Sequence, residues 1–212
     1  MPRLTFTRAP FLPLAPVEYN KAQQDQFANA LRLYFNQVDS NGAALLGPRG
    51  GQYLNFPYGS AYETTNQTAA LSNTAYALIL NAAGPCNGVT VDGTNGMVVP
   101  IPGVYNYAFS LQFRNTDSNF HAAHVWLKIN GVNAPWTASY ASVPSKHGST
   151  DGTTIMAANF LLELQAGDRI DLWWSTEDTT VSIWAVPATG TAPGSPSVAA
   201  SLTYVSSLST PA

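Results

Sequence analysis

The feature that most constrains the fold is an alternation of large apolar and small or polar residues in the middle of the chain. Tyr105, Tyr107, Phe109, Leu111 and Phe113 are apolar, and the residues between them are small or polar. Successive side chains of a strand point to opposite faces, so a period of two places all five on one face. The segment therefore predicts an antiparallel strand with one buried face.

The same alternation recurs along the rest of the chain. It appears in Val125/Leu127/Ile129, Phe160/Leu162/Leu164, Ile170/Leu172/Trp174, Val181/Ile183/Ala185 and Leu202/Tyr204, with shorter candidates at 75–80, 88–91 and 97–101. Turn sequences such as Asn130-Gly131 and Ala166-Gly167-Asp168 separate the runs. Many short strands with no second helix predict a mainly β protein, an all-β sandwich over residues 61–212.

The first 60 residues follow other patterns. Residues 1–17 contain four prolines and no periodicity, yet they are too apolar for an ordinary disordered tail. Their large apolar residues are Leu4, Phe6, Phe11, Leu12 and Leu14. We interpret the segment as an extended arm that anchors the chain in a groove of a partner protein; the alternative is an arm that folds back on its own domain.

Residues 18–40 predict one amphipathic helix. Asn20 is a suitable N-cap, and the sequence Asp39-Ser40-Asn41-Gly42 is expected to end the helix. The apolar residues at spacings of four, three and four form a packing seam of Phe27, Leu31, Tyr34 and Val38. Such a short helix is not stable by itself, so we expect it to pack on another surface. Either two further copies of the helix pack with it about an axis, or it packs on its own domain or on the host particle. Residues 41–60 are rich in Gly and Pro and predict a linker.

Composition excludes several classes of function. Charged residues make up 10% of the chain and the net charge is −3, which argues against nucleic-acid binding. The single Cys86 cannot form an intrachain disulfide, which suits assembly in a reducing cytoplasm. We see no signal peptide and no membrane span.

No catalytic, cofactor or metal site is predicted. Glu163 and Asp171 fall on opposite sides of a predicted hairpin and are interpreted as two solvated edge charges rather than a catalytic pair. His121 and His124 stand three apart at the start of a strand and point to opposite faces, so they do not form a zinc pair. We expect no enzyme activity.

The alternation along the predicted strands also indicates which tryptophans point away from the core. If Ile170, Leu172 and Trp174 face the core, then Trp173 points outward, and the same parity turns Trp126 and Trp184 outward. We interpret these three as a candidate subunit interface, because aromatic residues are enriched in interface cores. The alternatives are a carbohydrate or receptor platform, or coverage by the arm, the linker or a long loop.

Several runs resemble known families. Residues 103–109 (GVYNYAF) and 162–170 (LELQAGDRI) resemble the jelly rolls of complement and tumour-necrosis-factor proteins, where Gly turns the chain and Asp caps the turn. Residues 67–70, 73–77, 125–132 and 135–136 are similar to a domain of structural proteins of tailed phages, including marine phages and cyanophages. The resemblance covers residues 61–206, and residues 19–40 are similar to an N-terminal helix of such proteins.

The resemblance implies a jelly roll that forms a homotrimer on a phage particle and carries out no chemistry. The expected protein is a virion component assembled in the host cytoplasm, either a capsid or head–tail decoration or a short fibre, bound through its arm to other phage structural proteins. The alternative is a tail fibre or adhesin that binds a host receptor or glycan. Neither interpretation involves nucleic acid, a membrane or a cofactor.

Overall fold

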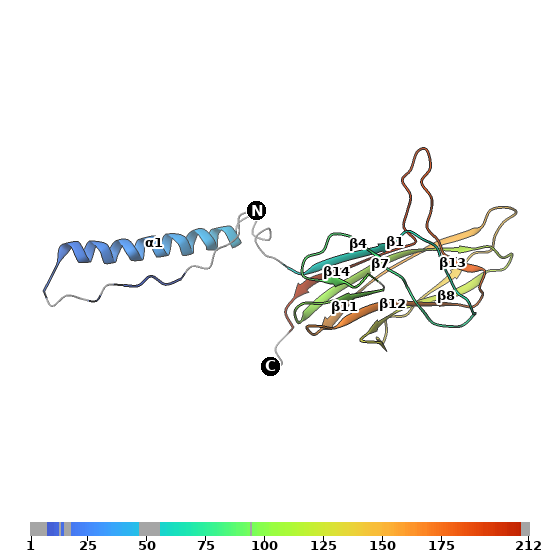
Figure 1. Ribbon diagram of the computed structural model, residues 1–212, viewed down its shortest axis with the longest axis horizontal. Coiled ribbons are helices and arrows are strands. Elements are labelled where there is room, and N and C mark those ends of the chain that lie inside the picture. The colour runs from blue at the N-terminus through green and yellow to red at the C-terminus, as the bar shows by residue number, and fades with distance from the viewer. Residues whose placement is uncertain (1–7, 13, 15–17, 47–55, 94, 209–212) are drawn as a thin grey trace. The chain divides into compact units, whose positions relative to one another are not determined.

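A computed structural model describes residues 8–12, 14, 18–46, 56–93 and 95–208 of the chain. The chain divides into two compact units, residues 1–55 and residues 56–212. The first unit contains a helix and the second contains the strands (Figure 1).

The first unit is built around α1, which runs from Lys21 to Leu46. Asn20 caps it as predicted: its side-chain oxygen accepts a hydrogen bond from the Gln23 backbone N–H at 3.2 Å. The predicted end of the helix near residue 40 is wrong, because α1 continues through Gly42. Gly42 does not adopt the positive φ of a helix-ending glycine. The strong helix formers 43–46 (AALL) that follow offset its cost of about 1 kcal/mol.

The predicted packing seam lies along α1 with little to cover it. Phe27, Leu31 and Tyr34 are half-buried, and Val38 is exposed. Leu33 and Phe35, which lie off the seam, are more than half exposed. A helix with this much uncovered apolar surface gains little from burial within its own unit.

The second unit consists of two antiparallel sheets, which we call sheet A and sheet B. Sheet A contains β1 (Tyr58–Glu63), β2 (Gln67–Thr68), β4 (Ala82–Ala83), β7 (Gly103–Asn115), β11 (Gly152–Leu164), β13 (Val181–Ile183) and β14 (Val198–Ser206). Sheet B contains β3 (Tyr76–Ala77), β5 (Thr90–Val91), β6 (Gly96–Val98), β8 (His121–Ile129), β9 (Val132–Asn133), β10 (Ser139–Val143) and β12 (Arg169–Thr176).

The long strands alternate between the sheets along the chain. β7 and β11 belong to sheet A, whereas β8 and β12 belong to sheet B. Within sheet A, β11 pairs with β7 over its whole length, and the other edge of β7 pairs with β14 and then β13. The predicted β-sandwich with one helix is confirmed. It begins slightly earlier than expected, because β1 starts at Tyr58, inside the predicted linker; residues 47–55 of that linker lie outside the described residues.

The core lies between the sheets and follows the predicted parity. The five alternating residues of β7 are all buried, at 0–4% exposure. From sheet B, the Trp174 ring packs against the rings of Tyr76 and Phe113, and its centroid lies 6.3 Å from each of theirs. Leu164, Leu172 and the other inward residues of β11 and β12 complete one continuous cluster.

The turn at residues 165–168 has the predicted chemistry but a different role. Gly167 has φ of +87°, and the Asp168 carboxylate accepts a hydrogen bond from the Gln165 N–H at 2.7 Å. The predicted hairpin is wrong, however, because the turn joins β11 of sheet A to β12 of sheet B. The strands on either side of it pair with β7 and β8 instead of with each other.

Candidate functional site

Two of the three predicted surface tryptophans lie together on the outer face of sheet B. Trp126 on β8 is directly opposite Trp173 on β12. The Lys128 ammonium lies 3.5 Å from the centroid of the Trp173 ring, and the Trp126 indole N–H donates to the Asn133 side chain at 2.9 Å. Both rings are therefore half-buried, and neighbouring side chains of the same sheet supply part of their cover.

The third tryptophan lies elsewhere. Trp184 follows β13 on the outer face of sheet A, where the Arg114 guanidinium lies 5.2 Å from its ring centroid. Arg114 also forms an ion pair with Asp151 at 2.5 Å. Trp184 thus belongs to a different face of the sandwich from Trp126 and Trp173, and the three residues do not form one surface.

The most exposed large apolar side chain of the β unit is one that the sequence analysis did not select as a site residue. Trp136 is 98% exposed and has φ of +63°. It lies between β9 and β10, which both pair with β8, so residues 134–138 form a bulge in one edge strand of sheet B. The break in alternation at Pro135-Trp136, after the Asn130-Gly131 turn, is the signal that could have identified it.

The Trp136 bulge is fixed by its buried neighbour Thr137. The Thr137 hydroxyl accepts a hydrogen bond from the Leu127 N–H at 3.1 Å and donates one to the Ala134 carbonyl at 2.8 Å. The Ala134 N–H in turn donates to the Leu127 carbonyl at 2.9 Å. Two of these hydrogen bonds attach the loop to Leu127 of β8, and Trp136 projects from the loop.

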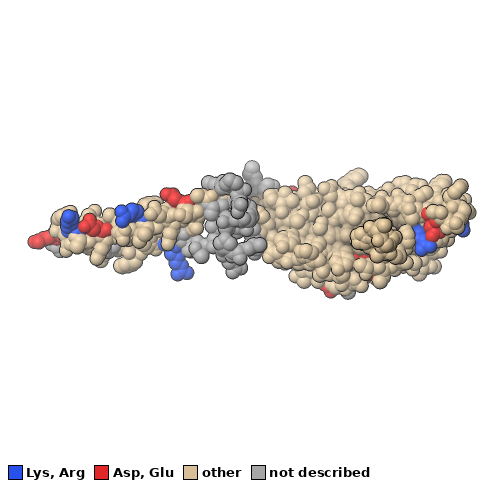
Figure 2. Space-filling model, turned by 90° about the horizontal axis from the view of Figure 1, so that it is seen from above, with Lys and Arg blue, Asp and Glu red and all other residues tan. Residues whose placement is uncertain are grey.

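The outer face of sheet A has very little charge. The charged residues on its strands are Glu63, which is buried, Arg114, which is paired with Asp151, and Glu163 at the end of β11. A shallow groove of about 660 Å³ crosses β1, β7 and β14; its floor includes the small residues Ser60, Ala108, Ser110, Ala199 and Ser201. Figure 2 shows a broad uncharged surface on the β unit.

Two further features project from sheet A. A hairpin with a bridge between Val186 and Ser195 extends away from the sheet between β13 and β14 (Figure 1). β11, which lies at an edge of sheet A, exposes Ile155 and Leu161, each to 70%. Among the described strands β11 pairs only with β7, so its second edge has unpaired backbone groups.

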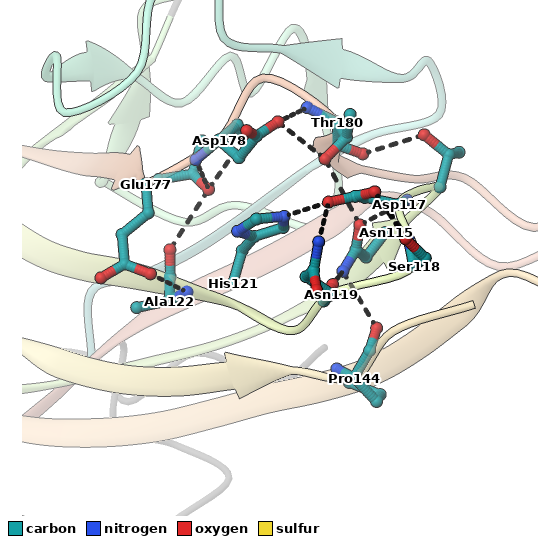
Figure 3. Close-up of polar contacts among 12 residues, drawn as sticks. Asn115, Asp117, Ser118, Asn119, His121, Ala122, Pro144, Glu177, Asp178 and Thr180 are labelled. Carbon is teal, nitrogen blue, oxygen red and sulfur yellow. Dashed lines mark hydrogen bonds and ion pairs between the residues drawn. The ribbon is translucent and has the colours of Figure 1, made fainter. Parts of the chain in front are cut away.

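A polar cluster occupies one end of the sandwich (Figure 3). The Asp117 carboxylate and the His121 ring are 2.8 Å apart. Hydrogen bonds from His121, Ser118 and Asn119 hold the pKa of Asp117 down to about 2. The fully buried Asn115 side chain donates to the carbonyls of Asn119 and Pro144.

A second loop closes this cluster through Asp178. Its carboxylate accepts hydrogen bonds from the Thr180 N–H and hydroxyl at 2.9 and 2.8 Å, which lower the pKa of Asp178. Glu177 accepts from the Ala122 N–H at 2.8 Å and so ties the loop to β8. These bonds cap loop backbone, and within the described residues no group of three His, Cys, Asp or Glu side chains is arranged to hold a metal ion.

The carboxylates considered in the sequence do not approach each other. Glu163 is exposed on sheet A, whereas Asp171 lies on the outer face of sheet B, where Arg169 donates to it at 2.8 Å. Burial raises the pKa of Asp171, although its bond to Arg169 opposes this shift. Arg169 also contacts Asp92 and Asn95. The expectation of a solvated edge charge is therefore wrong for Asp171, which is 7% exposed and paired with Arg169, whereas Glu163 is exposed.

The predicted arm is described only in part. Leu4 and Phe6 lie outside the described residues. Phe11 and Leu14 are 94% and 86% exposed, and Leu12 is half-buried. The Leu14 carbonyl accepts a hydrogen bond from the Gln23 side chain, but most of the apolar surface of Phe11 and Leu14 stays uncovered.

No known family model matches this chain, and no curated protein sequence matches it. Within the described residues, no helix combines the length and the hydropathy needed to cross a membrane.

Proposed function

We propose that this chain is a non-enzymatic structural subunit of a tailed-phage particle, a homotrimer that decorates the capsid or head–tail region or forms a short fibre. Its β-sandwich packs against the other copies, and its N-terminal arm attaches the trimer to other particle proteins. The support in the sequence is the resemblance of residues 61–206 to structural phage domains.

The observation that carries the proposal is the outer face of sheet A together with the edge of β11. An exposed, uncharged edge strand is a surface that monomeric proteins normally protect with charges, prolines or a covering segment. Residues 152–162 of β11 contain neither a charge nor a proline. Burying Ile155 or Leu161 against another copy would contribute roughly 1.5–3 kcal/mol for each side chain.

The exposed apolar residues of the arm support its attachment to another particle protein. Phe11 and Leu14 are almost fully exposed, and prolines at 10, 13 and 16 limit the conformations that binding must order. In a trimer the three arms would act together and increase the effective affinity.

Light scattering on the purified full chain tests the trimer and should give about three times 22.6 kDa. Leu161→Asp places a charge on the proposed interface and should dissociate the trimer. Val132→Asp is the matched control, because Val132 is 71% exposed on sheet B and should leave the trimer intact. A monomeric wild-type protein at micromolar concentration, or equal dissociation by both variants, would refute this arrangement.

The arm is tested separately by replacing Phe11, Leu12 and Leu14 with serine. We expect a folded trimer that no longer incorporates into particles. Particle assembly followed by a protein gel measures this, and incorporation at normal copy number would show that attachment does not depend on the arm.

A further inference from the structure

We propose that the Trp136 bulge and the adjoining outer face of sheet B form a binding site for a neutral saccharide chain, with the Trp136 ring stacking on a sugar. This site lies on sheet B and does not depend on the trimer proposed above.

Trp136 is exposed and has an unfavourable backbone conformation. A bulky residue with positive φ is unfavourable, and such strain persists only where the surrounding structure imposes it. Here the two hydrogen bonds of the buried Thr137 hydroxyl impose it. The backbone is therefore strained at a residue whose indole contacts almost nothing, because the Trp136 side chain is 98% exposed. Among the described residues, the packing of the β unit does not require this ring.

Exposed hydrogen-bonding side chains flank the bulge. Tyr140, at the start of the strand that follows the bulge, is 63% exposed, and its ring centroid lies 5.3 Å from that of the exposed His124. Asn133, at the other end of the bulge, is exposed while its side-chain oxygen holds the Trp126 indole. The site therefore offers aromatic rings together with a phenol, an imidazole and an amide.

The charged side chains on the outer face of sheet B contact neighbouring side chains. On this face the Lys128 ammonium lies over the Trp173 ring, and Arg169 donates a hydrogen bond to Asp171. Aromatic rings beside hydrogen-bonding groups fit a molecule with an apolar ring face and peripheral hydroxyls. A sugar has that chemistry. A protein partner is less well matched, because protein hot spots lie at the centre of a desolvated patch, whereas Trp136 stands at a sheet edge beside polar residues.

The test uses the full-length protein on an immobilised array of neutral oligosaccharides of glucose, galactose, mannose, rhamnose and N-acetylglucosamine. Affinity for any retained sugar is then measured by titration. We expect retention of at least one sugar and a loss of roughly 30-fold in affinity for Trp136→Ala. Trp136→Tyr should restore most of the affinity, because it restores an aromatic face.

Phe120→Ala is the matched control, since Phe120 is a 70% exposed aromatic residue just before β8, and it should change affinity by no more than about twofold. Light scattering on each variant separates a lost site from a lost trimer. Retention of no sugar by the wild-type protein would overturn the proposal, as would equal affinity of wild type and Trp136→Ala. Loss of particle incorporation in Trp136→Ala without any sugar retention would indicate a protein partner and would also overturn it.

Discussion

The hydroxyl of Thr137 provides a sharp test of how the edge of sheet B is held. Thr137 is 4% exposed, and its hydroxyl is the acceptor for the Leu127 N–H in a strand whose core residues are fully buried. Thr137→Val keeps the shape of the side chain and removes the hydroxyl. The Leu127 N–H then loses its partner in a place that water does not reach easily, and the Ala134 carbonyl loses its donor as well.

The expected cost follows from these two groups. A buried donor left without a partner costs about 1–3 kcal/mol, and the Ala134 carbonyl adds less because Ala134 is only half-buried. For a domain of this size, 1 kcal/mol shifts the melting temperature by roughly 2–4 °C. Taking the total cost as about 2 kcal/mol, we therefore expect Thr137→Val to melt about 4–8 °C below the wild-type protein.

Thermal unfolding followed by circular dichroism, together with urea unfolding, measures the change. Thr137→Ser is the matched control, because it keeps the hydroxyl and loses only a methyl group; it should stay closer to the wild type than the valine variant. Two results would contradict this account: a valine variant with the melting temperature of the wild type, or a serine variant with a lower melting temperature than the valine variant. The second result would show that methyl packing, and not the hydrogen bonds, fixes the bulge.

Three further predictions concern other parts of the chain. Leu164→Asp and Phe109→Asp should each prevent folding, because an unpaired charge in the core costs several kcal/mol against a total stability of about 5–15, and a near-native melting curve for either would show that the strand parity is wrong. The Asp117 carboxylate has a pKa near 2 in the folded state, below its ordinary value of 3.8, so it stabilises the fold above about pH 4 and this contribution is lost as the pH falls through 2. In urea titrations, the free energy of unfolding of Asp117→Asn should accordingly fall less than that of the wild type between pH 4 and 2. An equal fall in both proteins would contradict the role of the bond between Asp117 and His121. Trp136→Asn should raise the free energy of unfolding by about 0.5–1 kcal/mol, since asparagine tolerates positive φ, and a destabilised variant would mean that the indole packs on the fold.

Local patterns predicted much of the strand architecture. Tyr105, Tyr107 and Leu164 are buried as their alternation required, and Asn20 caps the helix that follows it. These properties depend on residues within a few positions of each other, because the direction of a side chain on a strand and the capping of a helix are set by local backbone geometry. The end of the helix was missed, since Gly42 can either stop a helix or continue it, depending on the residues that follow.

Sheet membership required the tertiary structure. Parity shows that Trp126, Trp173 and Trp184 turn away from the core, but it does not show which sheet each strand joins, so two of them share a face and the third does not. The same ambiguity made the turn at 165–168 resemble a hairpin, although it crosses between sheets.

The display of Trp136 also required the tertiary structure. It depends on the hydrogen bond from the Leu127 N–H of β8 to the Thr137 hydroxyl, and β8 precedes the bulge in the chain. Local alternation is interrupted at the bulge and does not report this contact. The physical reason is the same in each case. Alternation reports which side chains avoid water, whereas the free energy of strand pairing between distant segments decides which faces, edges and bulges come together.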